Sequence, residues 1–313
     1  MRHLFILNPA AGQGAALKLE KKIWQAADKC GIEPEIYVTK SPGDGEEYAR
    51  FKCETVCRAE GDRLRVYACG GDGTLNEVVN GIVGFDGVEV ANIPAGTGND
   101  FIRNFDGDFE NIEAQIKGES HLCDLIKYSG LAGGRSIEGY VANMFNIGFD
   151  CNVVDLTESM KKKPLLKGPL AYLASVGVLL AKKEGAELKV SCDDGYVYEG
   201  KLLLIAIANG CYCGGGVKGI PLARADDGLI DVSLVKNTTR RTFVRLFPKY
   251  SKGTHLDTKK AQEIVDYRKV KSLEIEPSGS DEMKICIDGE IAMVESMKFE
   301  IEPGAFKFVV PGR

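Results

Sequence analysis

A glycine-rich turn between an apolar strand and an amphipathic helix constrains the fold of this chain most. Leu64–Cys69 has strand character, and Gly70-Gly71-Asp72-Gly73 follows it. Three glycines in four residues let the backbone turn sharply and approach a ligand closely. Because amide groups point outward at the start of the helix that follows, the turn predicts phosphate binding. The apolar stripe of that helix recurs at helical spacing, with Leu75, Val78, Val79 and Ile82.

Two acidic residues in this motif each admit two interpretations. Thr74 and Glu77 have the spacing of a capping box, so Glu77 is either a helix cap or a ligand group. Asp72 is either a turn former or a ligand of Mg²⁺, because a carboxylate beside a phosphate needs an intervening cation. The turn is not a P-loop, since no Gly-Lys-Ser/Thr follows, and it lacks the dinucleotide G-x-G-x-x-G spacing.

The first part of the chain alternates strand and helix patterns, which predicts a parallel sheet with right-handed crossovers. Further strands are expected at His3–Leu7, Glu35–Thr39 and Val88–Ile93. The turns after parallel strands meet at the carboxyl edge of the sheet, where ligands of open α/β sheets bind. We therefore expect a polyphosphate site with Mg²⁺ there. Its side chains would be the hydroxyls of Thr74 and Thr97 and the carboxylates of Asp72 and Asp100.

The pattern changes after about residue 125 to longer β-type runs, which predicts a mostly antiparallel second domain. We expect an N-terminal domain at residues 1–128 and the second at residues 129–302, with the loop Leu131–Ser136 as a plausible junction. Two helical insertions are expected, at residues 168–183 and at Thr239–Tyr250. The second would form one apolar face from Phe243, Val244, Leu246 and Phe247.

Composition narrows the class of protein. The 313 residues suffice for about two domains, and the net charge of −5 argues against a nucleic-acid partner. Ten irregularly spaced cysteines and a start without a secretory signal favour reduced thiols in the cytosol over a disulfide framework. The chain has only three histidines, which argues against a Cys/His metal site. The apolar stretch Gly168–Ala181 is too short for a bilayer, which needs about 20 residues. Any membrane contact is therefore expected to be peripheral, and the lysines at 161–167 are either part of it or a solvated face.

Two Asp-Gly segments of the second half remain open to two interpretations. Arg224–Leu229 is either a cation-binding loop or a plain turn, and the residues alone favour the turn. Ile287–Glu290 is either a hairpin turn or a pair of carboxylates, Asp288 and Glu290, placed for proton abstraction.

These motifs together resemble a known family. The chain is similar to bacterial diacylglycerol kinases and YegS-type lipid kinases, which are related to sphingosine kinases and NAD kinases. The matching motifs are Asn-Pro-x-x-Gly at 8–12, Gly-Gly-Asp-Gly-Thr-Leu-Asn-Glu at 70–77, Pro-Ala-Gly-Thr-Gly-Asn-Asp-Phe at 94–101, Gly-Gly-Gly at 214–216, Asp-Gly-Leu-Ile-Asp-Val at 227–232 and Asp-Gly-Glu at 288–290.

The resemblance implies an N-terminal Rossmann-like, doubly wound α/β domain that binds ATP, a C-terminal mostly antiparallel β-sandwich, and catalysis in a cleft between them. The tail at residues 303–313 would pack back on the first domain. Asp72 and Asp100 would organise the catalytic Mg²⁺, and either Asp288 or Glu290 would be the general base. A structural Mg²⁺ would bind the side chain of Asp227 and the carbonyls of Arg224 and Leu229. The nucleotide-binding residues would be Asn8, Pro9, Ala10, Ala11, Gly12, Thr39, Gly71, Asp72, Gly73, Thr74, Leu75, Asn76, Glu77, Thr97 and Asp100.

The expected function is ATP-dependent phosphorylation of a lipid hydroxyl, with diacylglycerol giving phosphatidic acid. One alternative is an NAD kinase-like enzyme, although the Asn-x-Gly-x-Leu-Gly-Phe segment of NAD kinases is missing. The other is a catalytically idle nucleotide- or lipid-binding protein, which the retained carboxylates argue against. We expect a lipid substrate, peripheral membrane contact, no nucleic acid, and a homodimer as one allowed assembly. The expected location is the cytoplasm, transiently at the inner face of the membrane.

Overall fold

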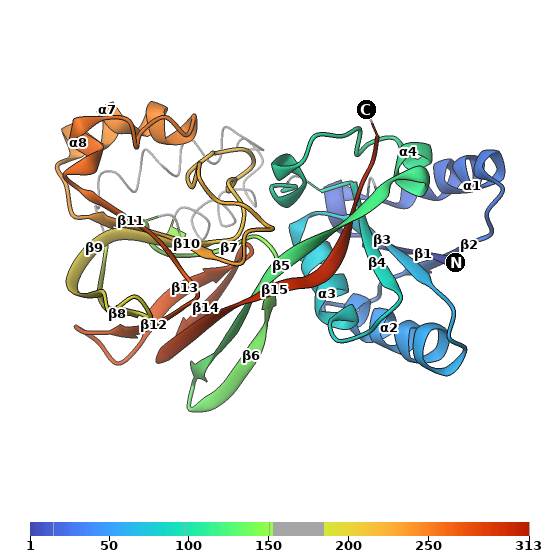
Figure 1. Ribbon diagram of the computed structural model, residues 1–313, viewed down its shortest axis with the longest axis horizontal. Helices are drawn as coiled ribbons and strands as arrows, with labels where there is room; N and C mark the ends of the chain where they lie inside the picture. Colours follow the sequence, from blue (N-terminus) through green and yellow to red (C-terminus); the bar gives the residue numbers. More distant parts are fainter. Residues whose placement is uncertain (15, 97, 150, 153–184, 313) are drawn as a thin grey trace. The chain divides into compact units, whose positions relative to one another are not determined.

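The chain folds into two compact units, shown in the computed structural model of Figure 1. The structure describes residues 1–14, 16–96, 98–149, 151–152 and 185–312. Unit 1 comprises Met1–Leu125 and Pro303–Arg313, and unit 2 comprises Ile126–Glu302. The chain passes from the first unit to the second within β5 (Glu119–Ala132) and returns within β15 (Ser296–Val310).

The expected junction at Leu131–Ser136 is wrong. Ala132 pairs with Arg135 at the end of an antiparallel hairpin between β5 and β6 (Arg135–Val141), inside unit 2. Glycines 133 and 134 both adopt positive φ, so a tight turn explains the polar, glycine-rich composition that suggested a linker.

Unit 1 is built on a parallel sheet in the strand order β2-β1-β3-β4. Strands β1, β3 and β4 are almost continuously buried because helices cover both faces of the sheet. Figure 1 shows α1 and α4 on one side of this sheet and α2 and α3 on the other. The elements are β1 (Arg2–Leu7), α1 (Leu19–Cys30), β2 (Pro34–Val38), α2 (Asp44–Lys52), β3 (Leu64–Gly70), α3 (Asp72–Ile82), β4 (Val88–Pro94) and α4 (Ile112–Lys117).

The C-terminal tail belongs to unit 1. Phe308 of β15 pairs in parallel with Val90 of β4. Phe306 and Phe308 also pack on the ring of Phe101, which follows the turn after β4. The end of the chain thus packs behind the segment that carries Asp100.

Unit 2 is an antiparallel assembly. Strand β9 pairs with β7, β8 and β10, and β13 pairs with β7 and β14. The core is formed by apolar side chains such as Phe145, Ile205 and Phe299. The strands after β6 are β7 (Met144–Gly148), β8 (Ala186–Cys192), β9 (Val197–Ala208), β10 (Ile230–Lys236), β11 (Val265–Val270), β12 (Ser272–Pro277), β13 (Met283–Ile287) and β14 (Glu290–Val294).

Two described helices pack on unit 2, α7 (Arg240–Ser251) and α8 (Lys259–Gln262). The expected helix at Thr239–Tyr250 is confirmed as α7, with Thr239 as its N-cap accepting a hydrogen bond from the Thr242 amide. The expected helix at 168–183 and the lysines at 161–167 lie outside the described residues. No helix among the described residues is long and apolar enough to cross a membrane.

Candidate functional site

Two glycine-rich turns of unit 1, the one after β3 and the one after β4, are in direct backbone contact. The amides of Ala95 and Gly96 donate to the carbonyl of Gly70, at 2.9 and 3.2 Å. A Cβ on Gly71 would lie 2.7 Å from the carbonyl oxygen of Gly98, and a Cβ on Gly96 would lie 2.8 Å from the Cα of Gly71. Glycine is therefore required at Gly71 and Gly96 because backbone meets backbone, a reason that the sequence did not reveal.

Gly73 is different from its neighbours. A Cβ built there meets no atom within 4 Å, so the first turn of α3 borders open space. Helix α3 begins at Asp72 with Gly71 as its N-cap, and within the described part of the chain no side chain caps it. The helix start is therefore available to an anion, as the sequence predicts.

Asp72 joins the two turns through its carboxylate. Its oxygens accept hydrogen bonds from the amides of Asp100, at 2.9 and 3.0 Å, and Phe101, at 3.2 Å. Burial and the nearby charge of Asp100 raise the pKa of Asp72 to about 6. The two carboxylates thus disfavour each other's charge, and a cation beside them would relieve that repulsion.

Asp100 completes this acidic pair. Its side chain is buried, and its Oδ1 lies 3.4 Å from Nε of Arg103. No group of three or more His, Cys, Asp or Glu side chains suited to a metal occurs among the described residues. Two carboxylates are enough for Mg²⁺ bound to a nucleotide, because phosphate oxygens and water supply its other ligands.

The turn after β1 meets the start of α3. Asn8 donates from Nδ2 to the hydroxyl of Thr74, at 3.1 Å, and accepts from the amide of Ala10. Gly12 has a φ of 58°, which favours glycine in this loop. The structure thus brings the loop with Asn8, Pro9, Ala10, Ala11 and Gly12 to the same place as Thr74, whereas Thr97 lies outside the described residues.

Glu77 is not the capping residue that its spacing suggested. Its carboxylate accepts from the amides of Gly43 and Gly45, at 3.0 and 3.1 Å, at the start of α2. A Cβ on Gly45 would lie 2.6 Å from Glu77 Oε2, so this contact needs glycine. These partners lie more than thirty residues away in sequence, which hid them from local patterns. Glu77 therefore fixes the turn after β2.

Three other predicted nucleotide-binding side chains also have structural partners. The Thr39 hydroxyl is buried and donates to the carbonyl of Leu7 at 3.4 Å. Leu75 is buried in the core. The oxygens of Asn76 accept from Nδ2 of Asn80, one turn along α3. The side chains of Thr39, Leu75 and Asn76 thus contact other parts of unit 1. Asp72, Gly73 and Thr74 lie at the start of α3.

In unit 2, the carboxylate of Asp227 forms an ion pair with a lysine. Lys269 Nζ lies 2.6 Å from Asp227 Oδ2 and 3.2 Å from Asp231 Oδ2. Asp231 is fully buried and also accepts from the Tyr267 hydroxyl at 2.7 Å. The side chain of Arg224 pairs with Asp226, at 3.1 Å. The ammonium of Lys269 thus supplies positive charge beside Asp227, and a divalent cation bound there would have to displace it.

Asp288 and Gly289 form the two-residue turn between β13 and β14, as one interpretation of the sequence predicts. Both have positive φ, 42° and 96°. Asp288 exchanges two hydrogen bonds with the backbone of Met144, at 3.1 and 3.2 Å. Glu290 pairs with Ile287 through the β13–β14 ladder, but its exposed carboxylate makes no hydrogen bond or ion pair with a described residue. Asp288 is therefore fixed in the turn, whereas Glu290 remains available to a ligand.

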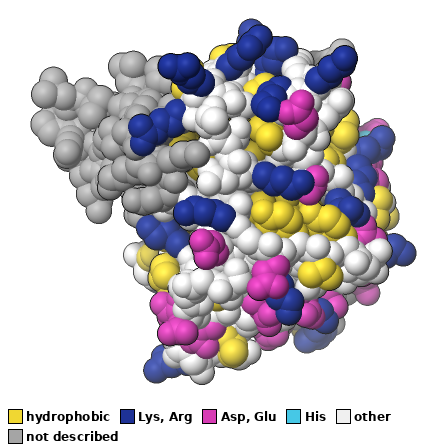
Figure 2. Space-filling view, turned by 90° about the vertical axis from the view of Figure 1, so that its left-hand side faces the viewer, with side chains coloured by type: hydrophobic (Ala, Val, Ile, Leu, Met, Phe, Trp, Pro, Cys, Tyr) yellow, Lys and Arg dark blue, Asp and Glu magenta, His cyan; other side chains and the backbone are white. Residues whose placement is uncertain are grey.

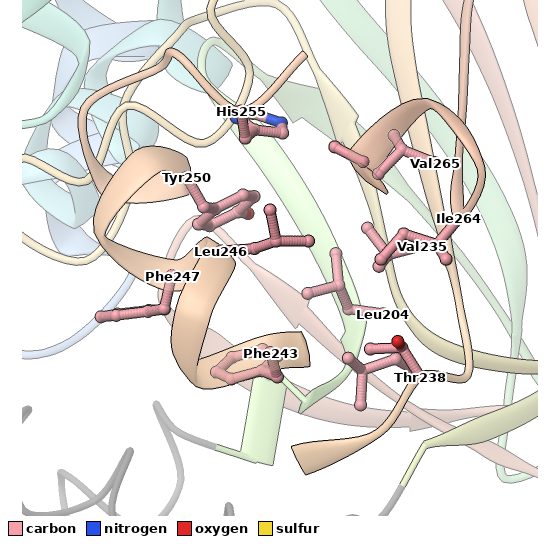
Figure 3. Close-up of a pocket in the computed structure, with 12 residues that line it drawn as sticks. Leu204, Val235, Thr238, Phe243, Leu246, Phe247, Tyr250, His255, Ile264 and Val265 are labelled. Carbon is pink, nitrogen blue, oxygen red and sulfur yellow. The ribbon is translucent and has the colours of Figure 1, made fainter. Parts of the chain in front are cut away.

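Unit 2 also contains an apolar pocket that the sequence did not predict (Figure 3). It lies between α7, β9 and β10 and is open to solvent; the space within it, including that open solvent, is about 470 Å³. His255 lines it and is buried, and neither of its ring nitrogens has a hydrogen-bond partner among the described residues. Burial lowers the pKa of His255 to about 4, so the ring is neutral at pH 7. The other lining residues are Leu203, Leu204, Val235, Thr238, Phe243, Leu246, Phe247, Tyr250, Ala261, Ile264 and Val265.

The apolar face of α7 differs in one residue from the prediction. Phe243, Leu246, Phe247 and Tyr250 of α7 all line the pocket, whereas Val244 is 56% exposed. A rotation of about 100° per residue places Val244 on the opposite side from Leu246 and Tyr250. Helical spacing could thus have found Tyr250 and rejected Val244.

Comparison with known proteins agrees with this arrangement. The model of the "YegS C-terminal NAD kinase beta sandwich-like domain" matches residues 143–310, more than half of the chain. The model of the "Diacylglycerol kinase catalytic domain" matches residues 2–128. The chain belongs to the diacylglycerol kinase and YegS-type lipid kinase family. The predicted family and the predicted fold class are both confirmed, and the protein is an enzyme of the lipid kinase type.

Named relatives resemble this lipid kinase over most of their length. A diacylglycerol kinase of Staphylococcus carnosus is 29% identical, covering 92% of this chain and 88% of the relative. A diacylglycerol kinase of Bacillus subtilis is 27% identical, covering 92% of this chain and 89% of the relative. The crystal structure of a diacylglycerol kinase from Bacillus anthracis superposes with a TM-score of 0.69 at 25% identity, covering 99% of this chain and 96% of that one.

Proposed function

We propose that this lipid kinase transfers the γ-phosphoryl group of ATP to a hydroxyl of diacylglycerol, with phosphatidic acid as the product. The observation that carries the proposal is the Asp72–Asp100 carboxylate pair beside the open first turn of α3. Such a pair suits a metal-bound triphosphate, since phosphoryl transfer depends mainly on positioning and charge neutralisation.

Mg²⁺ fits this pair of carboxylates. The raised pKa of Asp72 reflects a buried acidic site with excess negative charge, which a divalent cation would neutralise. Asp72 and Asp100 would hold the ion together with phosphate oxygens. When bound, Mg²⁺ would withdraw charge from the transferring phosphoryl group. The start of α3 and the loop that begins at Asn8 would contact the phosphates.

Glu290 is proposed as the general base and Asp288 as its positioning residue. A base must reach the acceptor hydroxyl, and the exposed carboxylate of Glu290 has no partner among the described residues that would hold it back. Asp288 is tied to Met144 and sets the turn from which β14 begins. Loss of Glu290 would therefore lower turnover directly, whereas loss of Asp288 would act through the hairpin.

The apolar pocket behind α7 supports a lipid as the acceptor. Its lining is almost entirely hydrocarbon and aromatic, and the buried ring of His255 is neutral, so an acyl chain would suit it. Named relatives of this chain are diacylglycerol kinases, which favours diacylglycerol over other lipid alcohols. Peripheral membrane contact and a homodimer remain predictions.

Labelled ATP incubated with Mg²⁺ and a panel of acceptors tests the proposal. The panel contains diacylglycerol, phosphatidylglycerol, a sphingoid base, an isoprenoid alcohol and NAD. Labelled phosphatidic acid is the expected main product; a labelled product from another acceptor would replace diacylglycerol, and none from any would contradict kinase activity.

Variants at the hairpin test the proton step. Glu290→Gln should lower kcat by roughly 10²–10⁴-fold with little change in ATP affinity. Asp288→Asn should lower kcat less and also reduce thermal stability, because it weakens the Met144 contact. Glu282→Gln is the matched control, since it removes an exposed carboxylate just before β13. Full activity of both hairpin variants would contradict the assignment.

A further inference from the structure

Positive charge is concentrated around α7. Residues 232–256 contain six basic residues and no acidic one, although the whole chain carries a net charge of −5. In Figure 2, Lys and Arg side chains gather along the upper edge, where α7 lies in Figure 1. The positive charge is therefore a local feature of α7 and the residues that flank it, in a chain whose net charge is negative.

Helix α7 has two contrasting faces. Its inner face contributes aromatic and aliphatic side chains to the pocket (Figure 3). The outer face carries Arg241, Arg245 and Lys249, with exposed Val244 and Pro248 between them. A helix with a basic face that also exposes apolar side chains is typical of one that lies on a lipid surface.

The outer cations are not neutralised within the described part of the chain. Arg241, Arg245 and Lys249 form no ion pair with a described residue, whereas nearby Lys236 pairs with Asp266 at 3.0 Å. A solvated polar face would more often mix both signs of charge. These three cations of one helix face are thus available to an anionic partner.

We infer that the outer face of α7, formed by Arg241, Val244, Arg245, Pro248 and Lys249, docks on an anionic phospholipid surface. This inference rests on the proposed function, since a kinase acting on a membrane lipid must reach the bilayer. Because a helix is about 10 Å across, docking through the outer face holds the pocket behind α7 within one helix diameter of the lipid headgroups. A lipid partner also accounts for the exposed Val244 and Pro248, which nucleic-acid phosphates would not contact favourably.

Vesicle sedimentation tests the docking surface. Wild-type protein should bind vesicles of phosphatidylcholine with phosphatidylglycerol, bind pure phosphatidylcholine weakly, and dissociate as salt rises. The triple variant Arg241→Gln, Arg245→Gln, Lys249→Gln should lose affinity by about 5-fold per charge, on the order of 100-fold in total. The matched control, Lys18→Gln, Lys21→Gln, Lys22→Gln near α1 of unit 1, should bind like the wild type.

A second measurement does not depend on removing charge. Val244→Trp in a Trp24→Phe background places the single tryptophan on the outer face of α7. Its fluorescence should shift to the blue on anionic vesicles, whereas Trp24 of the wild type should not respond. Vesicle binding equal in both triple variants, or an unshifted signal from the introduced tryptophan when vesicles are bound, would overturn the inference. Tighter binding to duplex DNA than to anionic vesicles would also overturn it.

Sedimentation requires neither ATP nor turnover, so the two proposals can fail separately. A chain that binds vesicles through α7 but phosphorylates no lipid would contradict the proposed function and leave the docking surface standing. A chain that makes phosphatidic acid but binds vesicles independently of α7 would contradict the docking surface and leave the proposed function standing.

Discussion

Asp72 and Asp227 both lie in glycine-containing turns, and both are candidate metal ligands from the sequence. The charge beside their carboxylates is opposite in sign. The carboxylate of Asp72 lies close to another carboxylate, Asp100, which raises its pKa. The carboxylate of Asp227 lies 2.6 Å from the ammonium of Lys269. One turn therefore has excess negative charge, and the other contains its own cation.

We interpret this difference in charge as the difference between a proposed ligand site at Asp72 and a structural contact at Asp227. A protein tolerates a buried acidic pair when a bound group completes it, and perturbed pKa values therefore cluster at functional sites. An aspartate already paired with lysine needs no further cation. The motif alone, an aspartate beside glycine, does not distinguish the two cases, and the following experiments test the distinction.

The largest difference should appear in catalysis. Asp72→Asn removes charge that would hold Mg²⁺, so kcat should fall by roughly 10²–10³-fold. Asp227→Asn leaves the nucleotide turns of unit 1 intact and should change kcat less than about 3-fold. Steady-state kinetics at saturating Mg²⁺ and ATP measure both. Equal losses in the two variants would break the comparison.

The second effect is on pH-dependent stability without Mg²⁺. The folded-state pKa of Asp72, about 6, exceeds the ordinary value of 3.8, so the folded chain binds this proton more tightly than the unfolded chain. Its contribution to stability is therefore favourable at low pH and is lost as pH rises from about 4 to about 6. That loss corresponds to at most about 3 kcal/mol.

Urea unfolding of the wild type and of Asp72→Asn at pH 4.5 and pH 7 isolates this contribution, because any constant offset between the proteins cancels. The wild type should lose more stability than the variant on going to pH 7, and Mg²⁺ should reduce the excess. If the free energy of unfolding changed with pH by the same amount in both proteins, the Asp72 carboxylate would not be destabilised by burial and by Asp100.

A smaller effect is expected at Lys269. Lys269→Met leaves Asp227 and the buried Asp231 without their cation. Because Lys269 is about a third exposed, the loss should be roughly 1–2 kcal/mol. Mg²⁺ should narrow the difference from the wild type by entering the vacated position. Lys271→Met, an exposed neighbour, is the control. No loss on Lys269→Met would show that Asp227 does not depend on that ammonium.

The smallest effect is expected at Glu77. In Glu77→Gln the side chain has one acceptor oxygen for the amides of Gly43 and Gly45, whereas the wild-type carboxylate has two. The loss of one acceptor should lower the free energy of unfolding by about 1 kcal/mol. The exposed Glu46→Gln on α2 should cost less than half of that. Thermal unfolding measures both variants. If Glu77 were a capping residue, Gln would replace it almost without loss.

Much of unit 1 was predictable because its signals are local. Strand runs, helical spacing and turn residues placed β1, β3, α3 and β4 correctly, and parallel topology then required their turns to share one edge. In unit 2, α7 was predicted for the same reason. The hairpin at Leu131–Ser136 was mistaken for a linker, since both use polar residues and glycine.

The sequence by itself determined the alternating fold, the position of the acidic turns and the family, because these depend on residue types at short spacing. Only the tertiary structure decided what each side chain contacts. Glu77 contacts the turn after β2, Lys269 occupies the position beside Asp227, and helix and strands far apart in sequence enclose the pocket with His255. Such contacts join residues separated by tens of positions, and local patterns carry no information on their distance. The burial and charge that distinguish Asp72 from Asp227 therefore exist only in the folded chain.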